Sequence, residues 1–98
     1  MLSYSHAAQQ DVLALDGSDR PRVEAALLKL TTDPQLRGYP LGGNLAGFRS
    51  LVVGKKKIRI VFKVISDQVV VFVIAIGHRR NDEVYLKAAT RTDESAEG

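Results

Sequence analysis

Hydrophobic residues recur at helical spacing through the first third of the chain. One stripe consists of Ala8, Val12 and Leu15, and a second consists of Val23, Ala26, Leu27 and Leu30. Ser3 or Ser5 is placed to cap the first helix, because serine favours helix N-termini. Asp19 and then Pro21 mark the start of the second helix for the same reason. The pattern predicts two adjacent helices, the second of which ends before Pro34.

Three apolar runs rich in β-branched residues follow a loop over residues 35–47. They span residues 48–53, 57–65 and 68–76, and polar breaks of two or three residues separate them. Short turns between such runs predict an antiparallel meander. The last run is apolar on both faces, which predicts a strand inside the sheet with both sides covered.

A final helix is predicted after Gly77, since Asn81 or Asp82 can cap it. Its apolar positions are Val84, Leu86 and Ala88. We therefore expect an α+β fold in one small domain over residues 1–91. In this fold the N-terminal helix pair packs on a three- to four-stranded antiparallel sheet, and the C-terminal helix follows. Residues 92–98 are expected to form a disordered tail.

Odd- and even-numbered residues of the second strand lie on opposite faces of the sheet. The apolar face consists of Ile58, Ile60, Phe62 and Val64. Arg59 and Lys63 therefore lie on the other face. A two-residue turn before the third strand would place Arg59 across from Ile74. His78 and Arg79 would then lie just beyond the end of the partner strand.

The loop between the first two strands decides where Arg49 lies. A loop of three residues would pair Val53 with Lys57. Arg49 would then share the face of Arg59. The expected result is a basic concavity at one end of the sheet, with Tyr85 on the first turn of the last helix beside it.

Charge is distributed unevenly along the chain. Residues 34–81 hold nine cations against one acid. Residues 1–33 hold three cations and five acids, and residues 82–98 hold two cations and five acids. A positive field over one part of a small fold favours a polyanionic partner, of which nucleic acid is the commonest.

Composition excludes several classes of site. The chain has no cysteine, so it has no disulfide, thiolate nucleophile or cysteine-ligated zinc. The longest apolar run, residues 69–76, is far shorter than the ~20 residues that a membrane helix needs, and no basic and apolar leader opens the chain. We expect a soluble cytoplasmic protein that does not enter a membrane.

The basic segment suits cleavage of RNA without a metal or other cofactor. RNA supplies its own nucleophile, the 2′-hydroxyl, so the protein has to orient it, neutralise charge on the phosphate and move protons. Arg59 and Arg79 suit the phosphate, because a guanidinium matches phosphate oxygens bidentately. Tyr85, His78 or a lysine would transfer protons.

Each of these residues also has a structural interpretation. The strand arginines would then be exposed cations that discourage edge pairing. Lys55, Lys56 and Lys57 would be a solvated hairpin tip, His78 a surface residue and Tyr85 a packing residue. The functional interpretation depends on their convergence at one end of the meander.

The order of these segments resembles the RelE side of the RelE/ParE toxin superfamily. The resemblance covers roughly residues 4–90, and its most specific parts are the strand segment Ile58–Phe62 and the ending Gly77–Tyr85. It implies a RelE-like fold and the toxin of a bacterial toxin–antitoxin module. Such a toxin enters the ribosomal A site and cleaves mRNA without metal, leaving a 2′,3′-cyclic phosphate. A cognate antitoxin wraps the toxin in a hetero-oligomer and often displaces its last helix.

The resemblance also implies roles for individual residues. Arg59, Arg79 and Tyr85 match the family's catalytic positions. The predicted RNA-binding residues are Arg49, Lys55, Lys56, Lys57, Lys63, His78 and Arg80. No metal ligand is expected.

The chain departs from the family at two points. Leu51 stands where well-studied members carry a lysine that transfers a proton, so either Lys55, Lys56, Lys57 or His78 replaces it, or cleavage is weakened or lost. Only residues 1–3 precede the first helix, where the family has a strand, so we expect that strand to be short, absent or truncated. Two alternatives to an mRNA endonuclease therefore stay open: a ParE-like inhibitor of DNA gyrase, and a degenerate member that only binds an antitoxin or nucleic acid.

Overall fold

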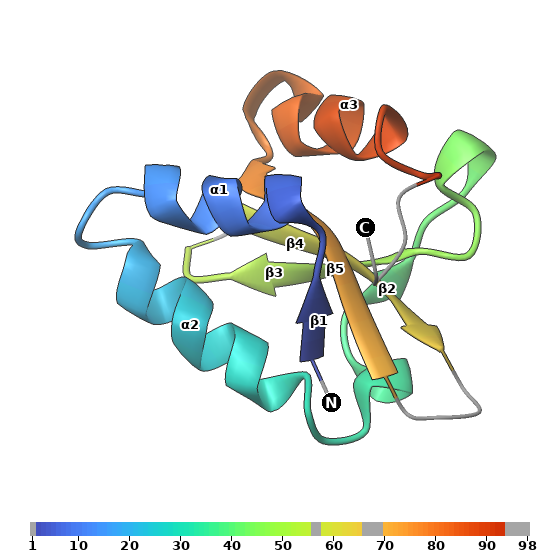
Figure 1. Ribbon diagram of the computed structural model, residues 1–98, viewed down its shortest axis with the longest axis horizontal. Helices are drawn as coiled ribbons and strands as arrows, with labels where there is room; N and C mark the ends of the chain where they lie inside the picture. The colour runs from blue at the N-terminus through green and yellow to red at the C-terminus, as the bar shows by residue number, and fades with distance from the viewer. Residues whose placement is uncertain (1, 56–57, 66–69, 94–98) are drawn as a thin grey trace.

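A sheet of five strands lies at the centre of the computed structural model, which describes residues 2–55, 58–65 and 70–93 (Figure 1). The strands are β1 (Leu2–Tyr4), β2 (Tyr39–Pro40), β3 (Arg49–Val53), β4 (Ile58–Ile65) and β5 (Val70–His78). Their spatial order is β1-β5-β4-β3-β2. β1 runs parallel to β5, and the other neighbours are antiparallel.

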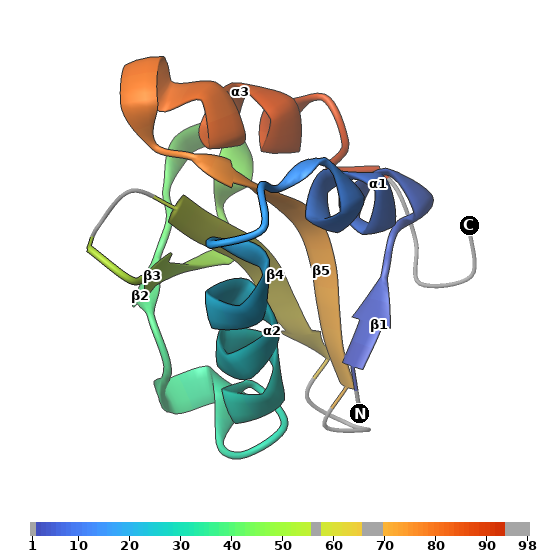
Figure 2. The same cartoon turned by 90° about the vertical axis from the view of Figure 1, so that its left-hand side faces the viewer.

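The helices are α1 (His6–Ala14), α2 (Arg20–Lys29) and α3 (Glu83–Ala89), and short 3₁₀ turns cover Pro34–Leu36, Gly43–Leu45 and Arg80–Asp82. In Figure 2, α2 stands in front of the sheet and α3 lies across its upper end. Among the described residues, no helix has both the length and the apolar character to cross a membrane.

Two apolar clusters fill the two sides of the sheet. The first joins α1 and α2 to the sheet residues Val53, Ile58, Ile60, Phe62, Val71, Val73 and Ile76. The second joins α3 and the loop before β3 to Val61, Phe72, Ile74 and Ala75. Residues 70–76 are all buried, which confirms that β5 is covered on both faces. The predicted apolar face of β4 is also confirmed.

The α+β class, the helix pair and the C-terminal helix are confirmed, but the sheet differs from the expected one. It has five strands within the described residues rather than three or four, and it is mixed rather than purely antiparallel. The extra strand at the N-terminus is short: Leu2 pairs with Val71 and Tyr4 with Val73. A segment of three residues is too short to show an alternating strand pattern, so its pairing with β5 identifies it as a strand.

The helix starts were predicted in part. Ser5, rather than Ser3, caps α1: its hydroxyl accepts a hydrogen bond from the Ala8 N–H at 3.0 Å. Asp19 precedes α2 but makes no side-chain cap, because its own backbone is already helical. Asp82 occupies the position before α3, likewise without a side-chain cap.

The predicted register of β4 on β5 is wrong. Ile65 pairs with Val70, so the connection is two residues longer than expected, and residues 66–69 lie outside the described part. The ladder then shifts by one residue between Val61 and Phe62, a β-bulge that local sequence does not signal. Arg59 consequently lies opposite Gly77 instead of Ile74.

The predicted three-residue loop between β3 and β4 is also wrong. Val53 pairs with Ile58, which makes the connection four residues long. A loop with an even number of residues exchanges the faces on which the β3 side chains were expected to lie. Arg49 therefore pairs with Phe62 and lies on the face opposite Arg59. The residues of β3 that share the face of Arg59 are Ser50 and Val52.

Residues 92–93 continue the turn that follows α3. The rest of the predicted disordered tail, residues 94–98, lies outside the described residues.

Candidate active site

A chain of hydrogen bonds joins polar side chains from four elements on the α3 side of the sheet. The Tyr85 hydroxyl of α3 lies 3.0 Å from the Ser50 hydroxyl of β3 and 2.9 Å from the Tyr39 hydroxyl of β2. Arg59 of β4 donates its Nε–H to the Tyr39 hydroxyl at 3.4 Å. The order is therefore Ser50, Tyr85, Tyr39, Arg59, with the cation at one end.

Tyr39 reaches this chain because β2 approaches β3 closely. Tyr39 pairs with Ser50, and the preceding Gly38 has φ +67°. A Cβ at Gly38 would lie 2.3 Å from the Ser50 carbonyl oxygen, so only glycine fits. Arg49 stabilises the segment just before Tyr39, because its guanidinium donates hydrogen bonds to the carbonyls of Arg37 at 2.8 Å and Gly38 at 3.1 Å.

Arg59 is buried, with 6% of its surface exposed. Its strand neighbours are Val52 and Gly77, and Tyr85 of α3 lies on the same face. In this conformation its guanidinium donates to the Tyr39 hydroxyl. Direct contact between Arg59 and a large anion therefore requires some of the residues around it to move.

The two tyrosines of this site differ in acidity. Burial alone would raise the pKa of Tyr39, but hydrogen bonds with Tyr85, Arg59 and Ser50 outweigh it and lower that pKa to about 8. Burial raises the pKa of Tyr85, and the neighbouring Tyr39 adds to this effect, whereas Ser50 and Arg59 oppose it. Tyr39 is thus the tyrosine that loses its proton more readily.

Lys63 lies on the same face as Arg59 but further along β4. The two are four positions apart, which corresponds to roughly 13 Å of extended strand. The Lys63 ammonium lies 5.5 Å from the ring centre of Phe48 and 5.9 Å from that of Phe72. These distances permit a cation–π interaction, so Lys63 flanks the site without joining its hydrogen-bonded chain.

The predicted residues at the end of β5 and just after it are exposed. Arg79 follows two positions after Gly77, the partner of Arg59, and Arg80 opens the short turn before α3. His78 pairs with Ile58 and so belongs to the other face of the sheet. Arg79 and Arg80 therefore follow the end of β5 that pairs with Arg59, whereas His78 lies on the opposite face of the sheet from Arg59.

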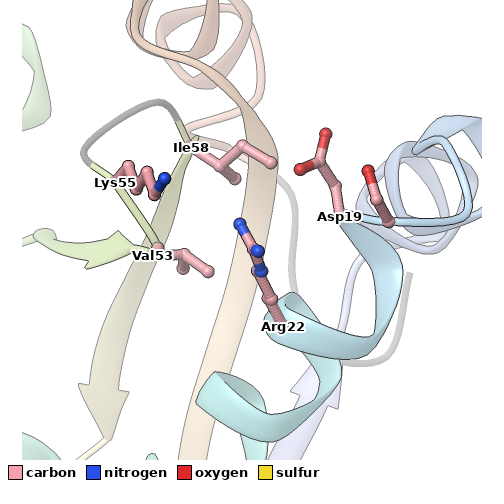
Figure 3. Close-up of a pocket in the computed structure, with 7 residues that line it drawn as sticks. Asp19, Arg22, Val53, Lys55 and Ile58 are labelled. Atoms are coloured by element: carbon pink, nitrogen blue, oxygen red, sulfur yellow. The ribbon is translucent and has the colours of Figure 1, made fainter.

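The remaining predicted residues lie elsewhere. Lys55 lines a separate small pocket with Ser18, Asp19, Arg22, Val53, Gly54 and Ile58. Figure 3 shows Arg22 reaching from α2 into the space between Lys55 and Asp19. Lys56 and Lys57 lie outside the described residues. Arg49 is on the opposite face, held to backbone carbonyls.

Leu51 does not face the site. It pairs with Ile60 and packs against the first apolar cluster. Val52, rather than Leu51, is the β3 residue directly beside Arg59. Within β3, the group on this face that could transfer a proton is therefore the Ser50 hydroxyl.

Sequence reasoning missed Tyr39 and Ser50. Tyr39 belongs to the segment interpreted as loop, and Ser50 lies within a predicted strand but carries no charge. The only local signal is Gly38, which permits the positive φ that brings the next residue against β3. Among the described residues, no group of three or more His, Asp or Glu side chains is arranged to hold a metal ion.

Comparison with known proteins places this chain in a family. Residues 2–83 match the model of the ParE toxin of the type II toxin–antitoxin system parDE. The chain is 28% identical over 90 residues to the mRNA interferase toxin RelE of Escherichia coli K12, covering 92% of this chain and 94% of that one. The mRNA interferase RelE of Shigella flexneri matches with the same identity and coverage.

Solved structures agree with this placement. A mutant of E. coli RelE in the free state superimposes with a TM-score of 0.75 at 26% identity, covering 93% of this chain and 95% of that one. The mutant bound to a peptide of the antitoxin RelB gives a TM-score of 0.70 at 26% identity, with 90% and 92% covered. The predicted resemblance is confirmed: the chain belongs to the ParE toxin family of type II toxin–antitoxin systems, and its similarity within the RelE/ParE superfamily is to RelE.

Proposed function

We propose that the chain is the toxin of a type II toxin–antitoxin system and cleaves mRNA at the ribosomal A site without a metal ion. The observation that carries this proposal is the contact between Arg59 and the Tyr39–Tyr85 pair. It combines a guanidinium suited to phosphate with hydroxyls that can move protons. The relatives named mRNA interferase support the same activity.

The proposed reaction is attack of the 2′-hydroxyl on the adjacent phosphate. Arg59 and Arg79 stabilise the charge that develops on the phosphoryl oxygens, and Tyr85 belongs to the proton-transferring cluster. Arg80 and Lys63 flank that cluster and bind the RNA backbone. Because Arg59 is buried, contact with the phosphate is accompanied by a movement of residues around it.

A cognate antitoxin is the second proposed partner. The E. coli RelE mutant that this chain resembles has been solved with an antitoxin peptide bound. The expected consequence is a toxin–antitoxin hetero-oligomer in which the site is silenced.

Inhibition of DNA gyrase is the competing function. Two observations favour it: the matching family model is that of a ParE toxin, and β3 presents Ser50 and Val52, rather than a lysine, beside Arg59. Binding to gyrase requires no proton transfer, so it would tolerate this arrangement.

The deciding experiment adds purified protein to translating ribosomes and maps new mRNA 5′ ends, with a gyrase supercoiling assay in parallel. New ends at A-site codons, absent with Arg59→Met and present with Lys29→Met, are the expected result. Lys29 is a matched control because it is an exposed cation at the end of α2. Blocked supercoiling without new 5′ ends would refute the nuclease.

A further inference from the structure

We propose that Tyr39 is the catalytic base of this site and that Tyr85 is a positioning residue that keeps its own proton. The inference rests on the proposed ribonuclease function and assigns the proton transfer within it. It concerns a residue from the two-residue strand β2, outside the motifs by which the family resemblance was drawn.

The hydrogen-bonded chain has a direction that favours charge on Tyr39. The Tyr39 oxygen receives the Arg59 Nε–H at 3.4 Å and lies 2.9 Å from the Tyr85 hydroxyl, which can donate to it. A phenolate on Tyr39 would therefore face one cation and one neutral donor. The Tyr85 hydroxyl, in contrast, lies between two neutral hydroxyls, those of Ser50 and Tyr39.

Exposure points the same way. Tyr39 is 41% exposed, whereas Tyr85 is half-buried against the apolar cluster beneath α3 and Arg59 is buried. A base has to come within hydrogen-bonding distance of the proton that it removes. Tyr39 is the member of the cluster that a ribose hydroxyl can approach without first unpacking the helix.

Acidity supports this geometry. The pKa of Tyr39 lies at about 8. Near neutral pH a useful fraction of Tyr39 is therefore deprotonated, and the phenolate still binds a proton strongly enough to act as a base. The pKa of Tyr85 is raised, first by burial, so Tyr85 stays protonated and able to donate.

In the proposed step, the 2′-hydroxyl gives its proton to the Tyr39 phenolate oxygen, and its electron pair forms the 2′-O–P bond. The P–O5′ bond breaks, and its electron pair leaves on the 5′-oxygen, which takes a proton from solvent water. The resulting hydroxide removes the proton from Tyr39 and restores the phenolate.

The first test needs no activity. The chain has three tyrosines, Tyr4, Tyr39 and Tyr85, so phenolate absorbance can be followed with pH. One tyrosine in the wild type should ionise near pH 8, and Tyr39→Phe should abolish this transition. Tyr4→Phe is the matched control and should retain it, since burial raises the pKa of Tyr4. Survival of the transition in Tyr39→Phe would overturn the inference.

The second test measures single-turnover cleavage of mRNA on stalled ribosomes between about pH 6 and 9. Wild-type cleavage should rise about tenfold per pH unit below about pH 8 and then level off. Tyr39→Phe should lower kcat by ~10²–10⁴ and flatten the profile, with KM nearly unchanged. Tyr4→Phe should cleave like the wild type.

The two possible failures are distinguishable. A wild type that cleaves while Tyr39→Phe has the same rate and pH profile refutes the role of Tyr39 alone. A wild type that never cleaves refutes the proposed function, and the catalytic role of Tyr39 with it. A change in KM without a change in kcat would make Tyr39 a binding residue and overturn its role as base.

Discussion

Arg91, just after α3, donates a hydrogen bond of 2.7 Å to the carboxylate of Asp11 on α1, although 80 positions separate them. The same carboxylate accepts from the Lys87 ammonium at 3.1 Å and from the Ile76 N–H at 3.0 Å. Lys87 and Arg91 also donate to carbonyls of β5, at Ile76 and Ile74. β1 pairs with β5 only as far as Val73, so these side chains bond the part of the strand edge that β1 leaves uncovered. This network holds α3, and hence Tyr85, against the sheet.

Asp11→Asn should weaken that network. The Asp11 side chain is only 10% exposed and Arg91 only 15%, so removal of the carboxylate charge leaves Arg91 poorly solvated and without its counter-ion. We expect the free energy of unfolding to fall by about 2–4 kcal/mol. Amide hydrogen exchange over residues 83–89 should also become faster. Urea unfolding and exchange mass spectrometry measure the two effects.

Asp93→Asn is the control for that prediction, because Asp93 is exposed beyond the helix. Its unfolding free energy should stay within about 0.5 kcal/mol of the wild type. Equal stability of Asp11→Asn and Asp93→Asn would show that the Asp11 network contributes nothing.

Gly38→Ala should disturb both stability and the site. The new methyl would collide with the Ser50 carbonyl oxygen, and the φ of +67° is unfavourable for alanine. We expect a loss of about 1–3 kcal/mol and a displaced Tyr39. Gly42→Ala is the matched control, since a methyl there would enter open space and the φ of Gly42 is −120°. Thermal unfolding of both variants tests this, and similar melting temperatures would contradict it.

Arg59→Met should raise the pKa of Tyr39. The guanidinium lowers that pKa both by its hydrogen bond and by its charge, so its removal should move the ionisation from about 8 toward the ordinary value of 10.0. The phenolate signal would therefore appear at higher pH, and any cleavage activity should require more alkaline conditions. Lys29→Met should leave the ionisation of Tyr39 unshifted. An unshifted Tyr39 transition in Arg59→Met would show that Arg59 does not lower the pKa of Tyr39.

Arg79 and Arg49 should differ in their dependence on salt. If RNA binds through phosphates, the logarithm of affinity should fall with the logarithm of salt concentration at about −0.7 per neutralised single-strand phosphate. Arg79→Ala should reduce the slope by about that amount, because Arg79 is exposed just after β5. Arg49→Ala should change the slope less and stability more, because its guanidinium is bonded to backbone carbonyls. A larger reduction of the slope in Arg49→Ala than in Arg79→Ala would show that Arg49 contacts the RNA phosphates.

The amino-acid sequence by itself determined the local elements of this protein and their faces. Helical spacing predicted α1 and α2, alternation predicted the apolar face of β4, and a run apolar on both faces predicted that β5 is covered on both sides. These patterns are readable because a side chain's direction repeats every 3.6 residues in a helix and every two in a strand. The residues from Ile58 to Phe62 and from Gly77 to Tyr85 also carried the most specific part of the family resemblance.

Only the tertiary structure decided which of these faces meet. A four-residue loop before β4 turned Arg49 away from Arg59, and the bulge in the β4–β5 ladder placed Gly77 opposite Arg59. Loop length and bulges set strand parity, and each depends on the pairing of distant segments rather than on local propensity. Tyr39 joined the site for the same reason, since its contact with Tyr85 spans 46 positions and exists only when β2 closes on β3.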